Sequence, residues 1–406
     1  MSNEWLLATP CVASLTAYAL AWCLAVGWLV ATRWRERLAI IEAAGDLRQA
    51  AGDLGQEEGL TILKPLCGGD EGLEENLRSF FLIEHEPLQL VFGAADPDDR
   101  ALVVVRRLMR RFPGRDVAIV VGADPAAPNP KVALLESLLP HARHDVILLS
   151  DSNVRLCGHE IAAVLPEFRD PGVGMVYQPV VAVGERTVPA TIENLHYTEY
   201  AALLTIGARL LAGQHTVNAK GQWVRRAALD AVDGFAGVRD RGADDYALSR
   251  LVAEAGWELR LAPECVQVVQ QDWSWTSFLA RNLRHAGLRW RICPWAYPLE
   301  LLFNPIPWAL LPLAAGSRPL ALLGATAIVV KILLEVSVAR LLRGVPLAGH
   351  LVPVILVKDL AIFGCWFVAL FGRTAVWRGR LYRLAPGGRI EPLTPVLPAS
   401  ELARAV

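Results

Sequence analysis

The sequence predicts an α/β domain with a Rossmann-like, mostly parallel sheet and flanking transmembrane helices. Two observations predict this fold class. The chain has 406 residues, of which 53% are hydrophobic, and its mean hydropathy is positive, but the apolar excess lies near the two ends. Between the ends, short apolar runs alternate with segments of helical periodicity, which is typical of a parallel sheet covered by helices on both faces.

The N-terminal segment is long and apolar enough to cross a bilayer. From Trp5 to Ala31 it contains no Asp, Glu, Lys or Arg, and about 20 apolar residues suffice to span the hydrocarbon core. Arginines follow at positions 33, 35 and 37, and basic flanks favour the cytoplasmic side. A cleaved signal peptide fits poorly, because no cationic region precedes the segment and its apolar stretch is too long. Residues 1–37 are therefore expected to form a transmembrane anchor.

The region 293–375 is expected to hold two or three further membrane helices. Apolar stretches run from about 298 to 315, 320 to 342 and 351 to 371. Lys331 and Glu335 interrupt the second stretch, and Lys358 and Asp359 interrupt the third. A charge at bilayer depth must be paired or must face a protein or water interior. These stretches are therefore either packed spans or partly interfacial or re-entrant helices.

The segment 376–406 is expected to be a cytoplasmic tail. It begins with a group of arginines, which favours the cytoplasmic side of the membrane. These are Arg378, Arg380 and Arg383.

The middle region, residues 55–292, is expected to form a cytoplasmic domain. Apolar runs predict strands at 60–63, 88–93, 117–121, 146–149 and 174–177, and periodic segments predict helices at 99–111, 131–142 and 159–168. In such sheets, ligands bind outside the carboxyl ends of the strands. The loops that follow these strands are therefore where chemistry is expected.

Polar and charged side chains follow three of the predicted strands. Lys64 ends the first, Asp96 follows the second, and Asp151 with Asn153 follows the fourth. Mg²⁺ and Mn²⁺ prefer oxygen ligands, and a nucleotide diphosphate supplies those that the protein does not. Each acidic residue alone fits a solvated loop or a helix N-cap equally well. Their joint placement at strand ends favours a site for a nucleotide and a divalent cation.

Two later motifs carry opposite charges. Asp244 and Asp245 begin a helical segment, where they fit either N-terminal capping chemistry or a general base that takes a proton from a hydroxyl group. Arg281 and Arg284 share a helix face. Such a pair stabilises a diphosphate leaving group, and the alternative is a basic amphipathic helix resting on anionic lipid.

Seven phrases stand in order along the chain: LKPLCGGDEGLEENLRSFF, DPDD, NPKV, HDVILLSDSNVRL, ENLH, ADDY and an arginine cluster that begins at Arg281. Together they resemble the A-type fold of inverting glycosyltransferases. The resemblance is closest to the ceramide glucosyltransferase family, which is glycosyltransferase family 21, with hopanoid-lipid glycosyltransferases nearby. It covers about residues 60–292 and extends loosely to both membrane ends.

The resemblance implies roles for the acidic residues. Asp96 is similar to a family aspartate that contacts the nucleotide. Asp151, with Asn153 behind it, is similar to the metal-binding motif beside the diphosphate, although many relatives have a second acid in place of Asn153. Asp245 is similar to the catalytic base, with Asp244 as its acidic neighbour.

The resemblance also implies three nucleotide-sugar ligands among the lysines. Lys64 stands in the first phrase, and Lys131 belongs to a family Asn-Pro-Lys. Lys220 falls where relatives place a lysine, although the surrounding residues here read Asn-Ala-Lys-Gly.

One family motif departs from the expected pattern. The last motif of the family is Gln- or Arg-x-x-Arg-Trp, but His285 follows Arg284 here. The nearby pair Arg289-Trp290 has Ala286 three positions before its arginine, so a second register remains an alternative.

The resemblance implies transfer of a hexose from a UDP-sugar to the hydroxyl of a membrane lipid, most directly ceramide, with Mg²⁺ or Mn²⁺ as cofactor. The largely apolar stretch 193–211 is expected to shape the acceptor side, and a bacterial inner membrane is the expected location. A hopanoid or another lipid is the alternative acceptor, and a catalytically silent membrane scaffold is the alternative of another class. The net charge of −1 gives no basic character that would attract nucleic acid. Seven cysteines without a C-x-x-C pair predict buried thiols and no zinc site or disulfide framework.

Overall fold

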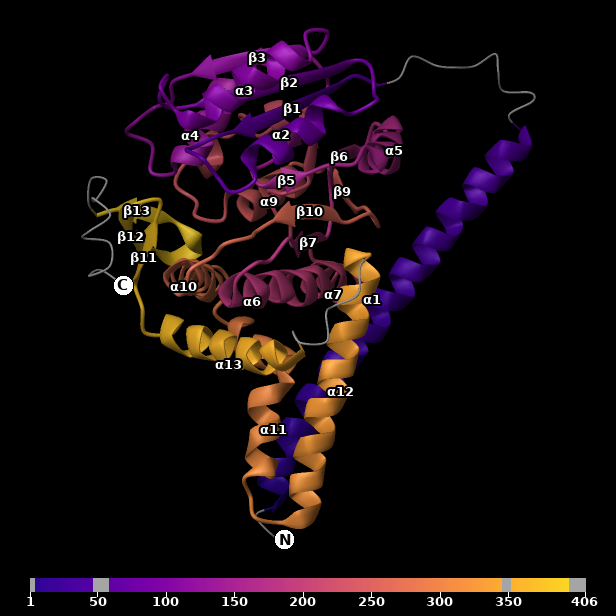
Figure 1. Ribbon diagram of the computed structural model, residues 1–406, viewed down its shortest axis with the longest axis vertical. Coiled ribbons are helices and arrows are strands. Elements are labelled where there is room, and N and C mark those ends of the chain that lie inside the picture. The colour runs from indigo at the N-terminus through magenta and orange to yellow at the C-terminus, as the bar shows by residue number, and fades with distance from the viewer. Residues whose placement is uncertain (1–3, 47–57, 345–351, 394–406) are drawn as a thin grey trace.

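The computed structural model describes residues 4–46, 58–344 and 352–393. An α/β domain sits on a narrow helical stem, and a small C-terminal sheet lies against the side of the domain (Figure 1). Parts of the expected segments, at residues 1–3, 55–57, 351 and 394–406, lie outside the described residues.

The main sheet has seven strands in the order β3-β2-β1-β4-β8-β6-β9. Strands β1 to β4 pair in parallel, β8 runs antiparallel to β4 and β6, and β9 is parallel to β6. The mostly parallel sheet is therefore confirmed, and the five predicted strands agree with the structure within two residues. The strands are β1 (Leu60–Pro65), β2 (Leu88–Ala94), β3 (Asp116–Val121), β4 (Val146–Leu149), β6 (Val173–Tyr177), β8 (Gln222–Arg225) and β9 (Glu258–Leu261).

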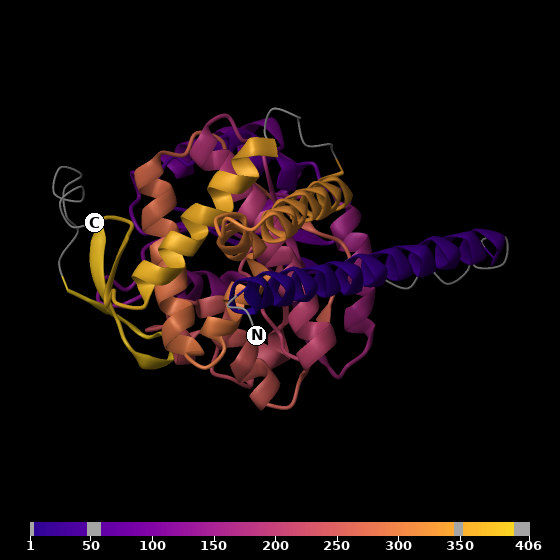
Figure 2. The ribbon, with the colours of Figure 1, turned by 90° about the horizontal axis from the view of Figure 1, so that it is seen from below.

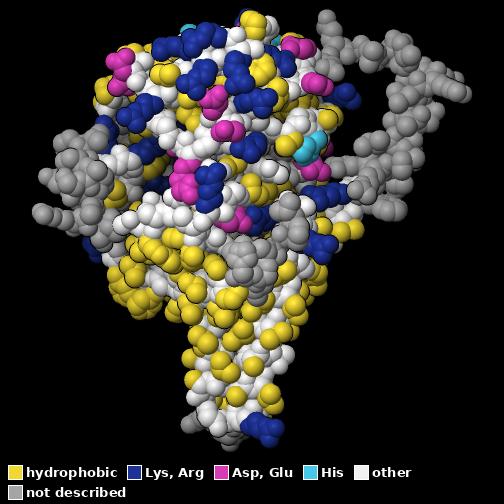
Figure 3. Space-filling model, viewed as in Figure 1, with side chains coloured by type: hydrophobic (Ala, Val, Ile, Leu, Met, Phe, Trp, Pro, Cys, Tyr) yellow, Lys and Arg dark blue, Asp and Glu magenta, His cyan; other side chains and the backbone are white. Residues whose placement is uncertain are grey.

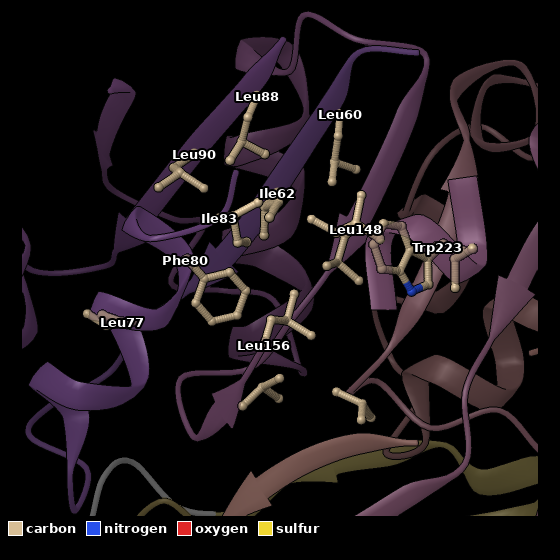
Figure 4. Packing of buried hydrophobic residues seen from close by; sticks show 14 of the residues in the cluster. Leu60, Ile62, Leu77, Phe80, Ile83, Leu88, Leu90, Leu148, Leu156 and Trp223 are labelled. Atoms are coloured by element: carbon tan, nitrogen blue, oxygen red, sulfur yellow. The ribbon is translucent and has the colours of Figure 1, made fainter. Parts of the chain in front are cut away.

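Both faces of this sheet are buried, which explains why its strands appear in the sequence as continuous apolar runs. On one face, Leu60 and Ile62 of β1 belong to a cluster with Phe80 and Trp223 (Figure 4). On the other face, Leu63 of the same strand belongs to a second cluster. Alternate residues of one strand thus contribute to two cores, one on each side.

Helices cover the two faces, and they include the predicted ones. The prediction at 99–111 matches α3, and those at 131–142 and 159–168 match α4 and α5, each extended by a short 3₁₀ turn. The helices are α2 (Leu73–Phe81), α3 (Arg100–Arg111), α4 (Pro130–Leu138), α5 (His159–Val164), α8 (Arg226–Asp230) and α9 (Asp244–Glu254).

A second, smaller sheet faces the stem. It contains β5 (Val154–Arg155), β10 (Val266–Val269) and β7 (Val180–Val183), in that order. Beneath it run α6 (Val188–His196), a π-helical turn called η3 (Tyr197–Ala201), and α7 (Ala202–Ala212). Helix α10 (Trp275–Ile292) lies beside α6 (Figure 1). These elements separate the α/β domain from the helices of the stem.

Two helices are long and apolar enough to cross a membrane. They are residues Trp5–Arg33 of α1 (Glu4–Asp46) and helix α12 (Arg318–Arg343). The stem that they form has a mainly hydrophobic surface, whereas charged side chains gather on the α/β domain (Figure 3). The described chain thus contains one strongly apolar, span-length helix near each end.

The other two expected spans differ from the prediction. Residues 298–315 form a 3₁₀ segment (Tyr297–Phe303) and the nine-residue helix α11 (Pro305–Leu313), because Pro305 starts a new helix. At ~1.5 Å per residue, α11 is too short to cross a bilayer. It packs closely on α12 instead, where a Cβ on Gly324 would come within 2.5 Å of the Ala309 carbonyl oxygen.

Helix α13 (Val352–Ala369) lies across the base of the α/β domain and not alongside α12 (Figures 1 and 2). The described C-terminal region therefore holds one helix that meets the length and apolarity of a span, where the sequence predicted two or three.

The described part of the expected tail is folded. Residues 374–392 form a three-stranded antiparallel sheet of β11 (Thr374–Trp377), β12 (Arg380–Leu384) and β13 (Ile390–Pro392). Alternate side chains of these strands pack on Leu288 of α10. The cytoplasmic location of this segment stays a prediction.

The charges within the apolar C-terminal stretches pair with one another and with the α/β domain. Lys331 and Glu335 of α12, Lys358 and Asp359 of α13, and Glu199 of η3 are each at most 5% exposed. The Lys358 ammonium lies 2.7 Å from both Glu199 and Glu335. Lys331 bonds to Glu335 and lies 3.1 Å from Asp359. This buried charge cluster joins the stem to the domain.

We expect Lys358→Met to destabilise the protein by about 3–5 kcal/mol, because removal of one member of a buried ion pair leaves its partners without compensation. The midpoint of thermal unfolding in detergent should fall clearly. Arg250→Met, which breaks an exposed pair with Glu254, is the control and should change stability by roughly 0.5 kcal/mol or less. Equal midpoints for the two variants would show that the cluster does not hold the stem.

Candidate active site

Three elements bring opposite charges together at the carboxyl edge of the main sheet. Asp151 follows β4, Lys131 stands in the first turn of α4, and Asp244 begins α9. The Lys131 ammonium lies 2.9 Å from an Asp244 oxygen and 3.6 Å from an Asp151 oxygen. One lysine therefore connects two of the acidic positions that the sequence singled out.

The Asn-Pro-Lys segment positions this lysine. The side chain of Asn129 caps α4 by accepting a hydrogen bond from the backbone N–H of Lys131 at 3.0 Å, and Pro130 suits the first helical position. The amide nitrogen of Asn129 also donates to the Arg241 carbonyl at 2.7 Å. The start of α4 is thereby tied to the loop that leads into α9.

Asp244 and Asp245 have different partners although they are adjacent. Helix α9 has Ala243 at its N-cap, without a side-chain cap, so capping does not explain the acidic pair. Asp244 is paired with Lys131. The carboxylate of Asp245 accepts backbone N–H groups from Ala219 at 2.9 Å and Tyr246 at 2.8 Å. Burial and the charge of Asp244 raise the pKa of Asp245 to about 6.

Asp151 and Asn153 share a cationic partner. The Lys220 ammonium bonds to the Asp151 carboxylate and donates to the Asn153 side-chain oxygen at 3.1 Å. Although burial opposes its charge, Lys131 and Lys220 hold the pKa of Asp151 well below its ordinary value. Two protein oxygens thus converge on one cationic position. This donor set fits Mg²⁺ or Mn²⁺, which accept one or two carboxylates with diphosphate and water oxygens, once Lys220 withdraws.

Lys64 lies beneath the site and not at its open side. Its side chain is fully buried, and its ammonium donates to the Ser150 hydroxyl at 3.1 Å and to the Asp151 carbonyl at 2.8 Å. It also lies 3.5 Å from the centre of the Phe80 ring. Burial lowers the pKa of Lys64 well below its ordinary value. The structure therefore places Lys64 where it supports the backbone of Asp151.

Among the described residues, Asp96 makes no bond to Lys131 or to its partners Asp151 and Asp244. It is exposed after β2, and its carboxylate accepts only the backbone N–H of Asp98, at 2.9 Å, within the described residues. Asp99, which the sequence did not single out, caps α3 and accepts the backbone N–H of Gly68 at 2.9 Å. Asp99 thus joins the loops after β1 and β2. In the sequence, its position at the start of the predicted helix was the feature that could have identified it.

Arg281 is held by α6 and η3. Its guanidinium lies 2.7 Å from Glu193 and donates to the Tyr197 hydroxyl at 2.6 Å. Glu193 also accepts a hydrogen bond from Asn282 at 2.7 Å. Arg281 therefore faces the interior, which is not the geometry of a basic helix face resting on lipid.

Arg284 has no carboxylate partner within the described residues. It contacts the His285 ring nitrogen at 3.3 Å and stacks over the Trp377 ring at 5.0 Å. Burial and the neighbouring charge of Arg281 lower the pKa of Arg284 to about 9. Burial and the same arginines hold the pKa of His285 well below its ordinary value, so its ring is neutral. Arg284 is thus a half-buried cation that pairs with no carboxylate in the described part of the chain.

The second register of the arginine motif, Arg289-Trp290, makes its contacts elsewhere. Arg289 pairs with Glu300 at 2.8 Å, and the Trp290 ring packs 5.6 Å from Tyr297. Both contacts are to the 3₁₀ segment that precedes α11. A tryptophan does stand beside Arg284, but it is Trp377 of β11, which no local sequence pattern could have indicated.

An A-type α/β fold with carboxylates and cations gathered at its strand ends is that of a glycosyltransferase. The chain belongs to glycosyl transferase family 21, whose family model matches residues 15–390. The resemblance seen in the sequence is thereby confirmed.

Curated relatives include ceramide glucosyltransferase 3 of Caenorhabditis elegans, which is 24% identical over 346 residues, covering 82% of this chain and 74% of that protein. The ceramide glucosyltransferase of Candida albicans is 32% identical over 109 residues, covering 24% of this chain and 20% of that protein. A solved mannosyltransferase from Pyrobaculum calidifontis, in complex with GDP-Man and Mn²⁺, matches with a TM-score of 0.51 at 17% identity. That match covers 86% of this chain and 99% of the other, and it concerns the fold.

We expect Lys220→Met to strengthen Mn²⁺ binding in the absence of nucleotide, because the variant removes the ammonium that occupies the position between Asp151 and Asn153. Titration followed by electron paramagnetic resonance measures the free ion. Arg239→Met, which removes a half-buried cation paired with Asp124 and Glu136, is the control and should leave the affinity unchanged. An unchanged affinity in Lys220→Met would mean that lysine and metal do not compete for one position.

Proposed function

We propose that this glycosyltransferase moves a hexose, with inversion, from a UDP-sugar to the hydroxyl group of a membrane lipid, in the first place ceramide. The observation that carries the proposal is the Asp244–Asp245 pair. One carboxylate is neutralised by Lys131, and the other has a pKa raised to about 6. The names of the curated relatives support ceramide as the acceptor.

In this mechanism Asp245 is the general base. Inverting transfer requires a group that takes the proton of the acceptor hydroxyl as its oxygen attacks the anomeric carbon. A carboxylate with a pKa of about 6 is unprotonated near neutral pH yet more basic than an ordinary aspartate. The backbone N–H groups of Ala219 and Tyr246 hold it in place.

The departing diphosphate is stabilised by Arg281 and Arg284. Charge-assisted hydrogen bonds from guanidinium groups match phosphate geometry, and no described carboxylate pairs with Arg284. Lys131 and Lys220 contribute further positive charge, and Asp96 binds the nucleoside end of the donor. Asp151 and Asn153 would hold a divalent cation, which would supply additional stabilisation of the diphosphate charge.

An apolar groove supports a lipid acceptor. It runs between α10, the C-terminal end of α13 and the C-terminal sheet, and it reaches Arg284. Ala280 and Leu283 of α10 line one side, and Val368, which is 53% exposed, lines the other. An alkyl chain in this groove would bring its polar end towards the arginines. Helices α1 and α12 hold the domain at a membrane surface, and Arg33 favours the cytoplasmic side.

A transfer assay with purified, detergent-solubilised protein tests the proposal. We expect Mn²⁺- or Mg²⁺-dependent formation of glycosylceramide from a UDP-hexose. Asp245→Asn should lower the rate by roughly 10²–10⁴-fold, the range for loss of a general base. Asp230→Asn, at the exposed end of α8, is the control and should retain activity.

The outcomes separate the alternatives. Product with a hopanoid or a glycerolipid and none with ceramide would keep the enzyme and change the acceptor. Failure to bind or turn over any donor would overturn the proposal and leave a silent membrane scaffold of the same fold.

The rate should depend on pH in a direction set by Asp245. Because the base must be unprotonated and its pKa is raised to about 6, kcat/KM should fall as the pH drops through about 6 and level off above it. The charge of Lys131 lowers this pKa, so Lys131→Met should move the fall to higher pH. A profile between pH 5 and 8 measures both effects. A flat profile would exclude Asp245 as the base.

A further inference from the structure

The C-terminal sheet is fastened to both sides of the candidate active site. The backbone N–H of Gly242 donates to the Gly388 carbonyl at 2.9 Å, and that of Ile390 donates to the Asp240 carbonyl at 2.8 Å. These bonds hold the loop that immediately precedes Asp244. On the other side, the Arg291 side chain of α10 donates to the Leu384 carbonyl at 2.8 Å.

The turn of the β11–β12 hairpin has an unusual residue. Trp377 pairs with Arg380, which leaves a two-residue loop of Arg378 and Gly379 with φ of 47° and 76°. Two positive φ values are typical of a type I′ turn, where Asn or Gly usually stands first. Left-handed backbone costs a side chain such as arginine about 1–2 kcal/mol. Local turn chemistry therefore does not explain an arginine here.

The position of the turn offers an explanation. The residue before it, Trp377, stacks on Arg284, so the tip of the hairpin lies at the arginines of the site. The charge of Arg378 also helps to lower the pKa of Arg284.

The guanidinium of Arg378 is free to bind a ligand. It is exposed, and within the described residues it makes no hydrogen bond or ion pair. On the same hairpin, by contrast, Arg383 lies 3.4 Å from Glu391.

The charges of the side chains around the site favour the binding of an anion. Lys131 and Lys220 are matched by Asp244 and Asp151, and Arg281 is matched by Glu193. Among the described residues, neither Arg284 nor Arg378 forms an ion pair with a carboxylate. Two guanidinium groups beside a strand end that receives a nucleotide suit a diphosphate, which accepts several charge-assisted hydrogen bonds.

We propose that Arg378 binds the diphosphate of the nucleotide-sugar donor together with Arg284, and that the C-terminal sheet thereby completes the donor site. This inference rests on the proposed function, because it assumes a nucleotide-diphosphate donor. The sheet then acts as part of the active site, although it follows the membrane-associated helices in the chain.

Arg378→Asn provides a test that separates binding from folding. Asparagine suits the first position of a type I′ turn better than arginine, so the variant should unfold at an equal or higher temperature. Its affinity for UDP, measured by calorimetry on the full chain in detergent with Mn²⁺, should fall about 10–100-fold. The affinity for UMP should fall less, since UMP lacks the second phosphate. A purely structural role would change stability and affinity in the same direction.

Arg383→Asn on the same hairpin is the matched control and should bind UDP as the unchanged protein does. Arg378→Lys keeps the charge but not the planar fork, so its affinity for UDP should lie between those of Arg378→Asn and the unchanged protein. UDP affinity in Arg378→Asn within twofold of the unchanged protein would overturn the inference while leaving the glycosyltransferase proposal intact. If the unchanged protein itself binds no UDP, both the proposed donor and the role of Arg378 fall together.

Discussion

The buried charge cluster between stem and domain is the constraint on which the other parts depend. Two lysines and three carboxylates are buried there, and the burial of each charge would be unfavourable without its partners. Their mutual attraction sets the position of η3, because Glu199 of η3 bonds to Lys358. Helix α6 leads directly into η3 and carries Glu193, which holds Arg281. A continuous set of contacts thus connects the stem to the arginines of the candidate site.

Within the site, one lysine makes two adjacent carboxylates different. Asp244 and Asp245 share a helix start, but Lys131 contacts only the first of them within hydrogen-bonding distance. The second retains a proton up to a higher pH because it is buried beside a like charge. Environments that separate the pKa values of neighbouring groups are a recurrent way of assigning acid–base roles.

Much of the fold and part of the candidate site could be predicted from the sequence. The strands were predicted because burial on both faces leaves an apolar run. Asp151 was singled out because parallel strands share one functional edge, and Asp244 because two adjacent carboxylates begin a helical segment. The burial of Lys64 depends on Phe80 and Ser150, which only the folded sheet brings near. The path of α13 depends on the charge cluster. Arg378 escaped prediction because its neighbours at the site are distant in sequence, and its arginine-rich surroundings suggested only a membrane flank.

The placement of the C-terminal sheet also has a consequence for the time at which the site is assembled during protein synthesis. The ribosome makes the α/β domain before α12 and α13, and it makes Trp377 only after both helices. A nascent chain can therefore fold its main sheet early, but Arg284 lacks its aromatic neighbour until the helices have been made and the hairpin has returned to the domain. A complete site would then exist only in molecules that have already made their stem.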